Sequence, residues 1–226
     1  DQSGNSNNFT VGGGTLTKTE DCPSNVFATL NGGVFQSPIT FANGNNQASY
    51  STGEWRWCPA TIGASTGKYY SEVKITSSSG YWITGILDLD DCKGYSNADT
   101  HFGKTAITPN GRGFAWYSDD GKIYYNNTSS SAFGTYGTGD YCNLAMDLDN
   151  GAFYIGKNGT WLNSGDPTSG SSKTGAVSTW TGGGTWTFAN AVASNAREYW
   201  NYGNGYFGTT AVSSAGTNAS GNGIFE

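Results

Sequence analysis

Side chains that could carry out acid–base or nucleophilic chemistry are scarce in this sequence. His101 is its only histidine, and as a general base it would need a nucleophile and an orienting acid close by. No G-x-S-x-G motif is present to set a serine nucleophile on a sharp turn. Sugar hydrolysis would need paired carboxylates, and the glutamates form no E-x-D-x-x-E array. We therefore expect no catalytic activity, with His101 as a loop residue beside Phe102.

Metal and cofactor binding is also weakly supported by the residue pattern. The four cysteines show none of the C-x-x-C spacing of zinc or redox sites. Two acidic clusters, at 88–91 and 147–149, could offer oxygen ligands to calcium, but neither matches a D-x-[DN]-x-[DN]-G loop. Turn chemistry explains Asp149 and Asn150 better. We expect no metal and no cofactor.

The cysteines fall into different settings along the chain. Cys142 shares the alternation of Leu144 and Met146, which predicts a small buried core residue. Cys22 and Cys58 are each followed by proline in loop-like sequence. We hypothesise that these two form a disulfide that ties the N-terminal leader to the body of the protein.

Aromatic residues outside the expected strands give the stronger functional signal. Trp55 lies in a stretch bounded by Gly, Ser and Pro, and several other aromatics fall in or near expected loops. Their flat faces could stack on sugar rings or anchor a protein partner, although about half would be buried at the ends of a sandwich. These loop aromatics are Tyr95, Tyr136, Trp161 and Trp180.

Composition excludes two classes of partner. Charged residues make up 12% of the chain, the formal net charge is −6, and the eleven basic residues are scattered singly. Such a surface argues against nucleic acid, whose phosphates attract clustered Lys and Arg. No apolar stretch approaches the roughly 18 residues that span a bilayer, so we expect no membrane insertion.

The residues from 139 to 162 predict a pair of antiparallel strands. Leu144, Met146 and Leu148 alternate with other residues, and Phe153 and Ile155 resume the alternation beyond Asn150-Gly151. Asn-Gly favours a primed two-residue turn, which needs positive φ at both positions. A second Asn-Gly, at 158–159, reverses the chain again.

Further strands are expected through most of the chain. The aromatic content is 15% and glycine reaches 35 residues, which suits short strands joined by tight turns. Long polar connections are expected at 88–109, 126–140 and 163–184, where binding residues often lie. The expected strands are 38–41, 60–62, 69–76, 81–87, 113–118, 123–125, 142–148, 152–155, 185–193 and 198–202.

Four stretches, in order, resemble the SPRY family. Residues 67–73 (GKYYSEV) are similar to its GKYYWEV strand, with Ser71 in place of the usual tryptophan. Residues 113–122 resemble its aromatic strand with a Y-x-x-D-G turn, residues 139–151 its signature hairpin, and residues 186–202 its last core strands. The resemblance covers about residues 61 to 208.

This resemblance implies an all-β fold: a two-sheet antiparallel β-sandwich of the SPRY, concanavalin A-like jelly-roll type. We divide the chain into an irregular leader with short strands (1–60), the sandwich (61–208) and a low-complexity linker (209–226). SPRY domains are non-catalytic recognition modules that bind through loops at one end and need no cofactor.

The same resemblance indicates which loops would read a partner. They are the connection after strand 83–87 and the turn Ser194-Asn195-Ala196 before Arg197. An alternative is that Arg197 pairs with an aspartate of 88–91 and only fixes the loops. The ligand-contact candidates are Trp55, Tyr95, His101, Tyr136, Asn195 and Arg197.

The leader adds a resemblance to structural proteins of bacteriophages, carried by the low-complexity start and by residues 24–31 (SNVFATLN). It implies a virion-surface module, on a fibre or capsid appendage, that binds host-surface glycan or protein and is made in the host cytoplasm. Two alternatives stay open: an architectural virion domain that packs on other virion subunits, and an intracellular protein-interaction adaptor. A homo-oligomer is compatible with each.

Overall fold

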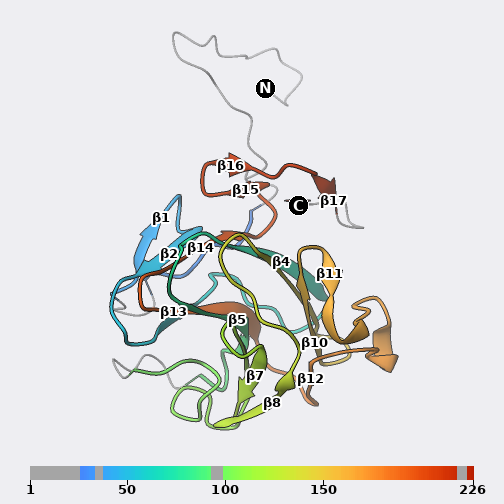
Figure 1. Cartoon of the computed structure of the whole chain (residues 1–226). Coiled ribbons are helices and arrows are strands. Elements are labelled where there is room, and N and C mark those ends of the chain that lie inside the picture. The colour runs from blue at the N-terminus through green and yellow to red at the C-terminus, as the bar shows by residue number, and fades with distance from the viewer. Residues whose placement is uncertain (1–25, 34–37, 93–98, 218–222) are drawn as a thin grey trace, which may run out of the picture.

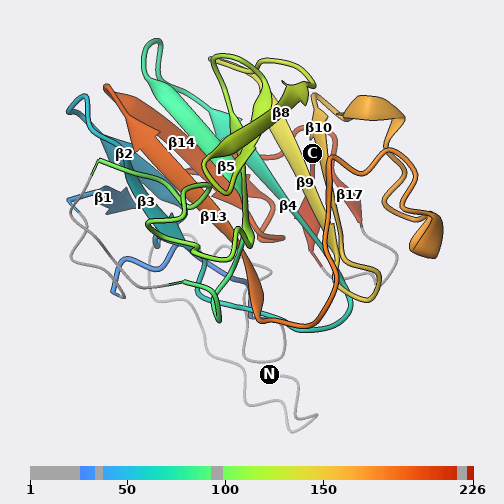
Figure 2. The same cartoon turned by 90° about the horizontal axis from the view of Figure 1, so that it is seen from below.

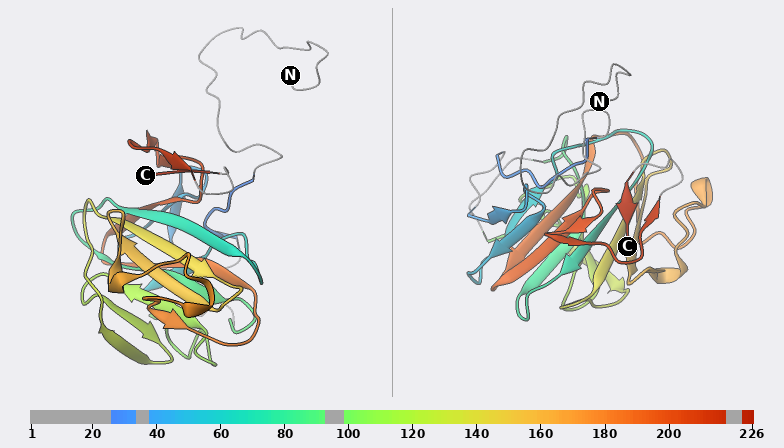
Figure 3. Two further views of the ribbon diagram at one scale, coloured as in Figure 1. Left: turned by 90° about the vertical axis from the view of Figure 1, so that its right-hand side faces the viewer. Right: turned by 90° about the horizontal axis from the view of Figure 1, so that it is seen from above.

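The computed structural model describes residues 26–33, 38–92, 99–217 and 223–226, and the chain folds there into two large antiparallel sheets stacked face to face (Figures 1 and 3). The all-β sandwich expected from the sequence is confirmed. Apart from two short 3₁₀ turns, η1 (Leu162–Ser164) and η2 (Gly170–Ser172), the described elements are strands.

The strands divide between the sheets as follows. The eight-stranded sheet has the order β1 (Thr40–Ala42), β2 (Gln47–Tyr50), β14 (Ala196–Asn201), β4 (Lys68–Ile75), β9 (Tyr141–Asp147), β10 (Ala152–Lys157) and β11 (Thr160–Trp161), with β12 (Ser178–Thr179) also on β10. The six-stranded sheet has the order β3 (Arg56–Pro59), β13 (Trp186–Ala193), β5 (Tyr81–Asp88), β6 (Gly113–Tyr117), β7 (Lys122–Tyr125) and β8 (Thr128–Ala132). Two small sheets pair β15 (Tyr206–Phe207) with β16 (Thr210–Ala211) and β17 (Gly216–Thr217) with β18 (Ile224–Phe225).

The hairpin of β9 and β10 has the expected register but not the expected turn. Met146 pairs with Phe153 and Leu144 with Ile155, and all four are buried in the core between the sheets. Asp147 pairs with Ala152, so the connection is the four residues 148–151 rather than a primed two-residue turn. Only Gly151 adopts positive φ there, at 67°. The primed geometry occurs instead at Asn158-Gly159, with φ of 51° and 77°, between β10 and β11.

Ser71, which stands where the SPRY pattern has a tryptophan, lies in the buried interior of the sandwich. Ser71 is fully buried and pairs with Leu144 across β4 and β9. Trp116, Trp186 and Trp200 are among the largest fully buried side chains. Large buried aromatic side chains are thus supplied from other positions of the chain.

The outer face of the six-stranded sheet is covered by the connection that follows β5. Phe102 and Ile107 pack on Ile83, Leu87 and Trp57 in a second buried cluster. Figure 2 shows residues 99–112 running across this face of the sheet. The expected open, polar loop is therefore a packed layer over much of its length.

Buried aspartates hold this connection in place. Asp88 accepts a hydrogen bond at 2.5 Å from the Nε of Arg112, and Asp91 accepts bonds from the main-chain and side-chain nitrogens of Asn110. The alternative in which Arg197 pairs with this cluster is wrong, since Arg112 is the partner. Asp88 and Asp91 are both buried.

The last residues of the chain pack on the outer face of the eight-stranded sheet (Figure 3). The Phe225 ring contacts Tyr70 at 4.9 Å between centroids, and Phe207 contacts Tyr141 at 5.1 Å. The main-chain nitrogen of Glu226 donates to buried Glu72 at 3.0 Å. The described residues of 209–226, expected as a low-complexity linker, thus include β16, β17 and β18, and Phe225 packs on the sheet.

The division at residue 61 also differs from the structure. The strands β1, β2 and β3 lie before it and are members of the two main sheets. They were expected only as short strands packed on the sandwich. Sequence patterns also missed β2, and they placed β8 inside an expected loop, because Thr128–Ala132 is an exposed edge strand without apolar alternation.

The cysteine expectations have different outcomes. Cys142 is fully buried in the core, as predicted. Cys58 is a free, fully buried thiol on β3 whose Sγ donates to the Asn190 side-chain oxygen at 2.9 Å. Cys22, its predicted disulfide partner, lies outside the described residues.

A carboxyl group is buried between the two sheets at Glu198. One of its oxygens accepts a hydrogen bond from the Trp200 indole at 2.7 Å, and the other has no partner among the described residues. Burial raises the pKa of Glu198 from 4.5 to about 8. The folded protein therefore holds a proton at neutral pH that the unfolded chain releases.

This proton makes the fold less stable as pH rises. From about pH 4.5 to 8 the native state binds more protons than the unfolded state, so Glu198 lowers the free energy of unfolding by about 1.4 kcal/mol per pH unit. The variant Glu198→Gln should lack this pH dependence. Its free energy of unfolding should therefore increase relative to that of the wild type as the pH rises to 8. Urea unfolding at several pH values measures the difference, and a pH-independent difference would contradict the prediction.

Two glycines at positive φ test the turn geometry. A Cβ on Gly151 would lie 2.3 Å from the Trp180 carbonyl oxygen, whereas one on Gly159 meets nothing within 4 Å. Gly159→Ala should cost on the order of 1 kcal/mol through backbone strain. Gly151→Ala should cost about 1–3 kcal/mol more, because of the added clash. Equal melting temperatures for the two variants would show that the Trp180 contact is absent.

Candidate functional site

Four connections meet at one end of the sandwich and are tied together by hydrogen bonds that main-chain N–H groups donate. Ser194 N donates to the Thr52 carbonyl at 2.6 Å, and Arg197 N donates to the Ser77 hydroxyl at 2.8 Å. These bonds join the connections β2–β3, β4–β5 and β13–β14, and a bond from Trp82 N to Ser118 adds β6–β7. Side chains at this end are therefore held on a fixed frame.

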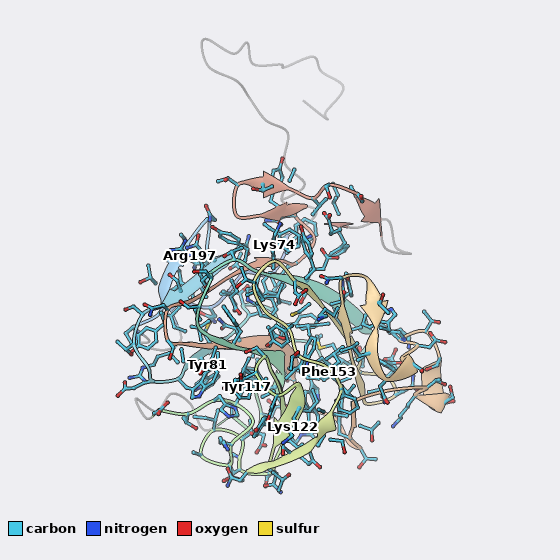
Figure 4. The ribbon with its side chains drawn as sticks, in the orientation of Figure 1. Lys74, Tyr81, Tyr117, Lys122, Phe153 and Arg197 are labelled. Carbon is cyan, nitrogen blue, oxygen red and sulfur yellow. The ribbon has the colours of Figure 1, made fainter. Side chains whose placement is uncertain are left out.

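Aromatic rings gather on the outer face of the six-stranded sheet at this end. The Trp55 ring lies 5.5 Å from Tyr117 and 6.5 Å from Tyr81, and Tyr117 lies 5.9 Å from Tyr124. Figure 4 shows Tyr81 and Tyr117 side by side. Tyr81 is 43% exposed. We call Trp55, Tyr81, Tyr117 and Tyr124 the aromatic patch.

Strand alternation and the covering segment together position the patch. Tyr81 shares the outer face with Ile83, and Tyr117 pairs with Ile83 across β5 and β6. Phe102 covers this face further along the sheet. The aromatic patch is thus the part of the outer sheet face that residues 99–112 leave uncovered.

His101 ends the covered region and does not reach solvent. It is 5% exposed, its Nδ1 accepts a hydrogen bond from Gly103 N, and its ring lies 5.9 Å from both Trp55 and Tyr124. Burial, with a smaller effect of Lys104, lowers the pKa of His101 to about 3. The prediction that His101 contacts a ligand is corrected: His101 is a buried, neutral ring that packs against the Trp55 ring.

The phenols of the patch are neutral hydrogen-bonding groups. Burial, aided by Asp119, raises the pKa of Tyr117 to about 12, and the hydrogen bond from Tyr124 to Asp120 raises the pKa of Tyr124 to about 12. Lys122 pairs with Asp120 at 3.6 Å beside them. The patch therefore offers flat apolar faces and uncharged hydroxyls.

A groove of about 490 Å³ lies at the same end, on the eight-stranded sheet. Its lining includes Arg197 and Asn195, both exposed, together with Tyr50 and Thr52. Asn195 has φ of 68° in the turn before β14. We call this the arginine groove.

The candidates named from the sequence thus have different fates. Trp55, Asn195 and Arg197 lie at one end, and whether they bind a ligand stays a prediction. The two loops named from the SPRY pattern leave the sheets at opposite ends, because the end of β5 pairs with the start of β13 and Asn195 follows the end of β13. Tyr136 is buried, with its hydroxyl 2.9 Å from the Trp116 carbonyl and 3.0 Å from the Trp82 carbonyl, so its assignment to the binding surface is wrong. Tyr95 lies outside the described residues.

Sequence reasoning missed three members of the patch. Tyr81, Tyr117 and Tyr124 were included in expected strands and treated as sandwich residues. Tyr81 begins β5 and Tyr117 ends β6, and this place at strand ends was the available signal for those two.

Other kinds of site are not evident in the described part of the chain. No group of three or more His, Cys, Asp or Glu side chains gathers there as a metal site would require. No helix in the same residues has the length and apolar character needed to cross a bilayer.

Comparison with known proteins adds the fold family. No protein-family model matches the chain, and no curated protein matches it in sequence. The SPRY domain of human HERC1 is structurally similar, with a TM-score of 0.53 and 13% identity over 72% of this chain and 91% of that domain. At this identity the likeness shows a SPRY-like fold and no more.

Tyr136 supplies the test of the corrected assignment. Tyr136→Phe should cost about 1–2 kcal/mol, since it removes the one hydroxyl proton that the buried Trp82 and Trp116 carbonyls share. Tyr136→Ala should cost about 3–5 kcal/mol and lower Tm by roughly 10 °C. Calorimetry measures both, and an unchanged Tm in the alanine variant would return Tyr136 to the list of surface residues.

Proposed function

We propose that this SPRY-like sandwich is a non-catalytic recognition module that binds a partner through the aromatic patch. The observation that carries the proposal is the exposed Tyr81 ring, set beside Trp55 and Tyr117 on a rigid sheet. Rigid aromatic faces lose little conformational entropy on binding and contribute strongly to affinity. SPRY-like folds are interaction modules, which agrees with this use of the surface.

The titratable groups support a role without catalysis. The carboxyl groups with raised pKa, Glu72 and Glu198, are fully enclosed, and His101 is buried with a pKa of about 3. A general base at a surface would need a pKa near 7 and access to substrate. The imidazole nearest to the aromatic patch, that of His101, is buried and neutral.

We further propose that the module is on the surface of a bacteriophage virion and binds host-surface glycan or protein. The support is the likeness of the leader, including the described residues 26–31, to phage structural proteins, together with an aromatic patch suited to sugar rings or apolar side chains. Many copies on one particle would compensate for weak single-site binding.

An architectural role is the second candidate, favoured by a different surface. Val26, Ile62 and Tyr69 are 65%, 45% and 41% exposed and line one apolar groove of about 250 Å³. It lies at the opposite end of the sandwich from Tyr81, beside the start of β4. Packing on a neighbouring virion subunit would cover it.

Two tyrosines of matched exposure separate the candidates. Purified chain would be screened against a glycan array and a panel of bacterial cell surfaces. Tyr81→Ala should weaken any binding by about tenfold or more, as loss of an aromatic anchor does. Tyr69→Ala, 41% exposed against 43% for Tyr81, should leave binding unchanged.

Both variants should keep Tm within a few degrees, since exposed substitutions change stability by about 0.5 kcal/mol or less. Loss of binding in Tyr69→Ala, with Tyr81→Ala unaffected, would move the binding surface to the opposite end and defeat the proposal.

A further inference from the structure

The arginine groove contains a row of polar side chains that crosses three strands. Thr40 pairs with Ser49 across β1 and β2, and Ser49 pairs with Arg197 across β2 and β14. Residues in register on neighbouring strands point to the same face and lie about 5 Å apart. Two hydroxyls and a guanidinium are thereby aligned along one wall.

The rest of the lining is also rich in hydrogen-bonding groups. Four of its nine residues are serine or threonine, and Asn195 adds a planar amide. Tyr50 also lines the groove, and the Arg56 guanidinium lies 5.4 Å from the centroid of its ring. Aspartate and glutamate are absent from the described lining.

The guanidinium of Arg197 forms no ion pair with a carboxylate of the described residues. Lys18 and Lys93 lie outside the described residues. Of the nine remaining basic residues, Arg197 included, five pair with carboxylates: Arg56, Lys68, Arg112, Lys122 and Lys157. Lys74 and Lys104 face aromatic rings. Among the described residues, no carboxylate lies within ion-pairing distance of Arg197. Its exposed guanidinium is therefore open to an external anion.

The main chain of Arg197 is fixed although its side chain is exposed. Its nitrogen donates to Ser77, and its carbonyl accepts bonds from Thr76 N and the Trp82 indole at 3.2 Å each. Figure 4 shows Arg197 beside the β1–β2 hairpin. A guanidinium on a fixed frame suits two-point binding of a carboxylate.

We propose that the arginine groove binds an acidic sugar residue, with Arg197 on its carboxylate and the surrounding hydroxyls and amide on its ring hydroxyls. The lining favours a sugar over an acidic peptide, because it offers many polar groups and lacks a deep apolar pocket for a peptide side chain. This inference rests on the proposed recognition function and names its ligand class.

Two sugars that differ only at the acidic group test it. Methyl β-D-glucuronide and methyl β-D-glucoside would be titrated into ¹⁵N-labelled full chain, following the amides of Ser49 and Asn195. The glucuronide should shift both amides, and the glucoside should bind at least about tenfold more weakly, as expected for loss of a charge-assisted pair.

Variants give the matched controls. Arg197→Gln should reduce glucuronide affinity about tenfold or more, and Arg197→Lys should restore only part of it, because an ammonium lacks the two-point geometry. Lys173→Gln removes a cation from a different groove and should have no effect. Raising the salt concentration should weaken binding.

Equal affinity for the two sugars, or tighter binding of a triglutamate peptide than of the glucuronide, would overturn the inference. So would an absence of glucuronide shifts in a chain that still shows Tyr81-dependent partner binding, an outcome that leaves the proposed function standing. If the glucuronide binds but Tyr81→Ala affects the binding of no partner, the proposal for the arginine groove is supported. Only the proposal for the aromatic patch is then contradicted.

Discussion

Two buried aspartates at the end of β5 determine which part of the outer sheet face stays open. Asp88 is bound by Arg112 Nε and Thr185 N, and Asp91 by Asn110 and Arg112 N, so both ends of the connection 89–112 are fastened at one place. Removing one partner would leave a buried charge uncompensated, which is far more costly than losing a surface pair. In the described part of this connection, Phe102 and Ile107 pack on the sheet, and the aromatic patch lies beyond them on the same face.

The same end of the sandwich combines two kinds of recognition surface on one frame. The patch lies on the six-stranded sheet and the arginine groove on the eight-stranded sheet, and residues 52–55 connect them along the chain. The main-chain bonds of Ser194 and Arg197 join the sheets at this point. The aromatic patch and the Arg197 guanidinium are therefore presented at the same end, and few side chains need to be ordered when a partner binds.

What the sequence could predict was local. Alternation predicted the register of β9 and β10 and the burial of Cys142, because a two-residue period has only two faces to choose from. The burial of Tyr136 and His101 depends on contacts with residues far away in the chain, and no local pattern records these. For the same reason, the pairing of Asp88 with Arg112 was missed, and the β9–β10 turn was misjudged because Asp147 bonds to Asn150.

The central claim is that partners bind at the end of the sandwich that carries Tyr81. Hydrogen–deuterium exchange of the chain, with and without a cell-surface extract that it binds, measures this directly. The account predicts slower exchange in the connections at 51–56, 76–81, 117–122 and 193–197. Protection confined to the opposite end, around Ile62 and Tyr69, would contradict it.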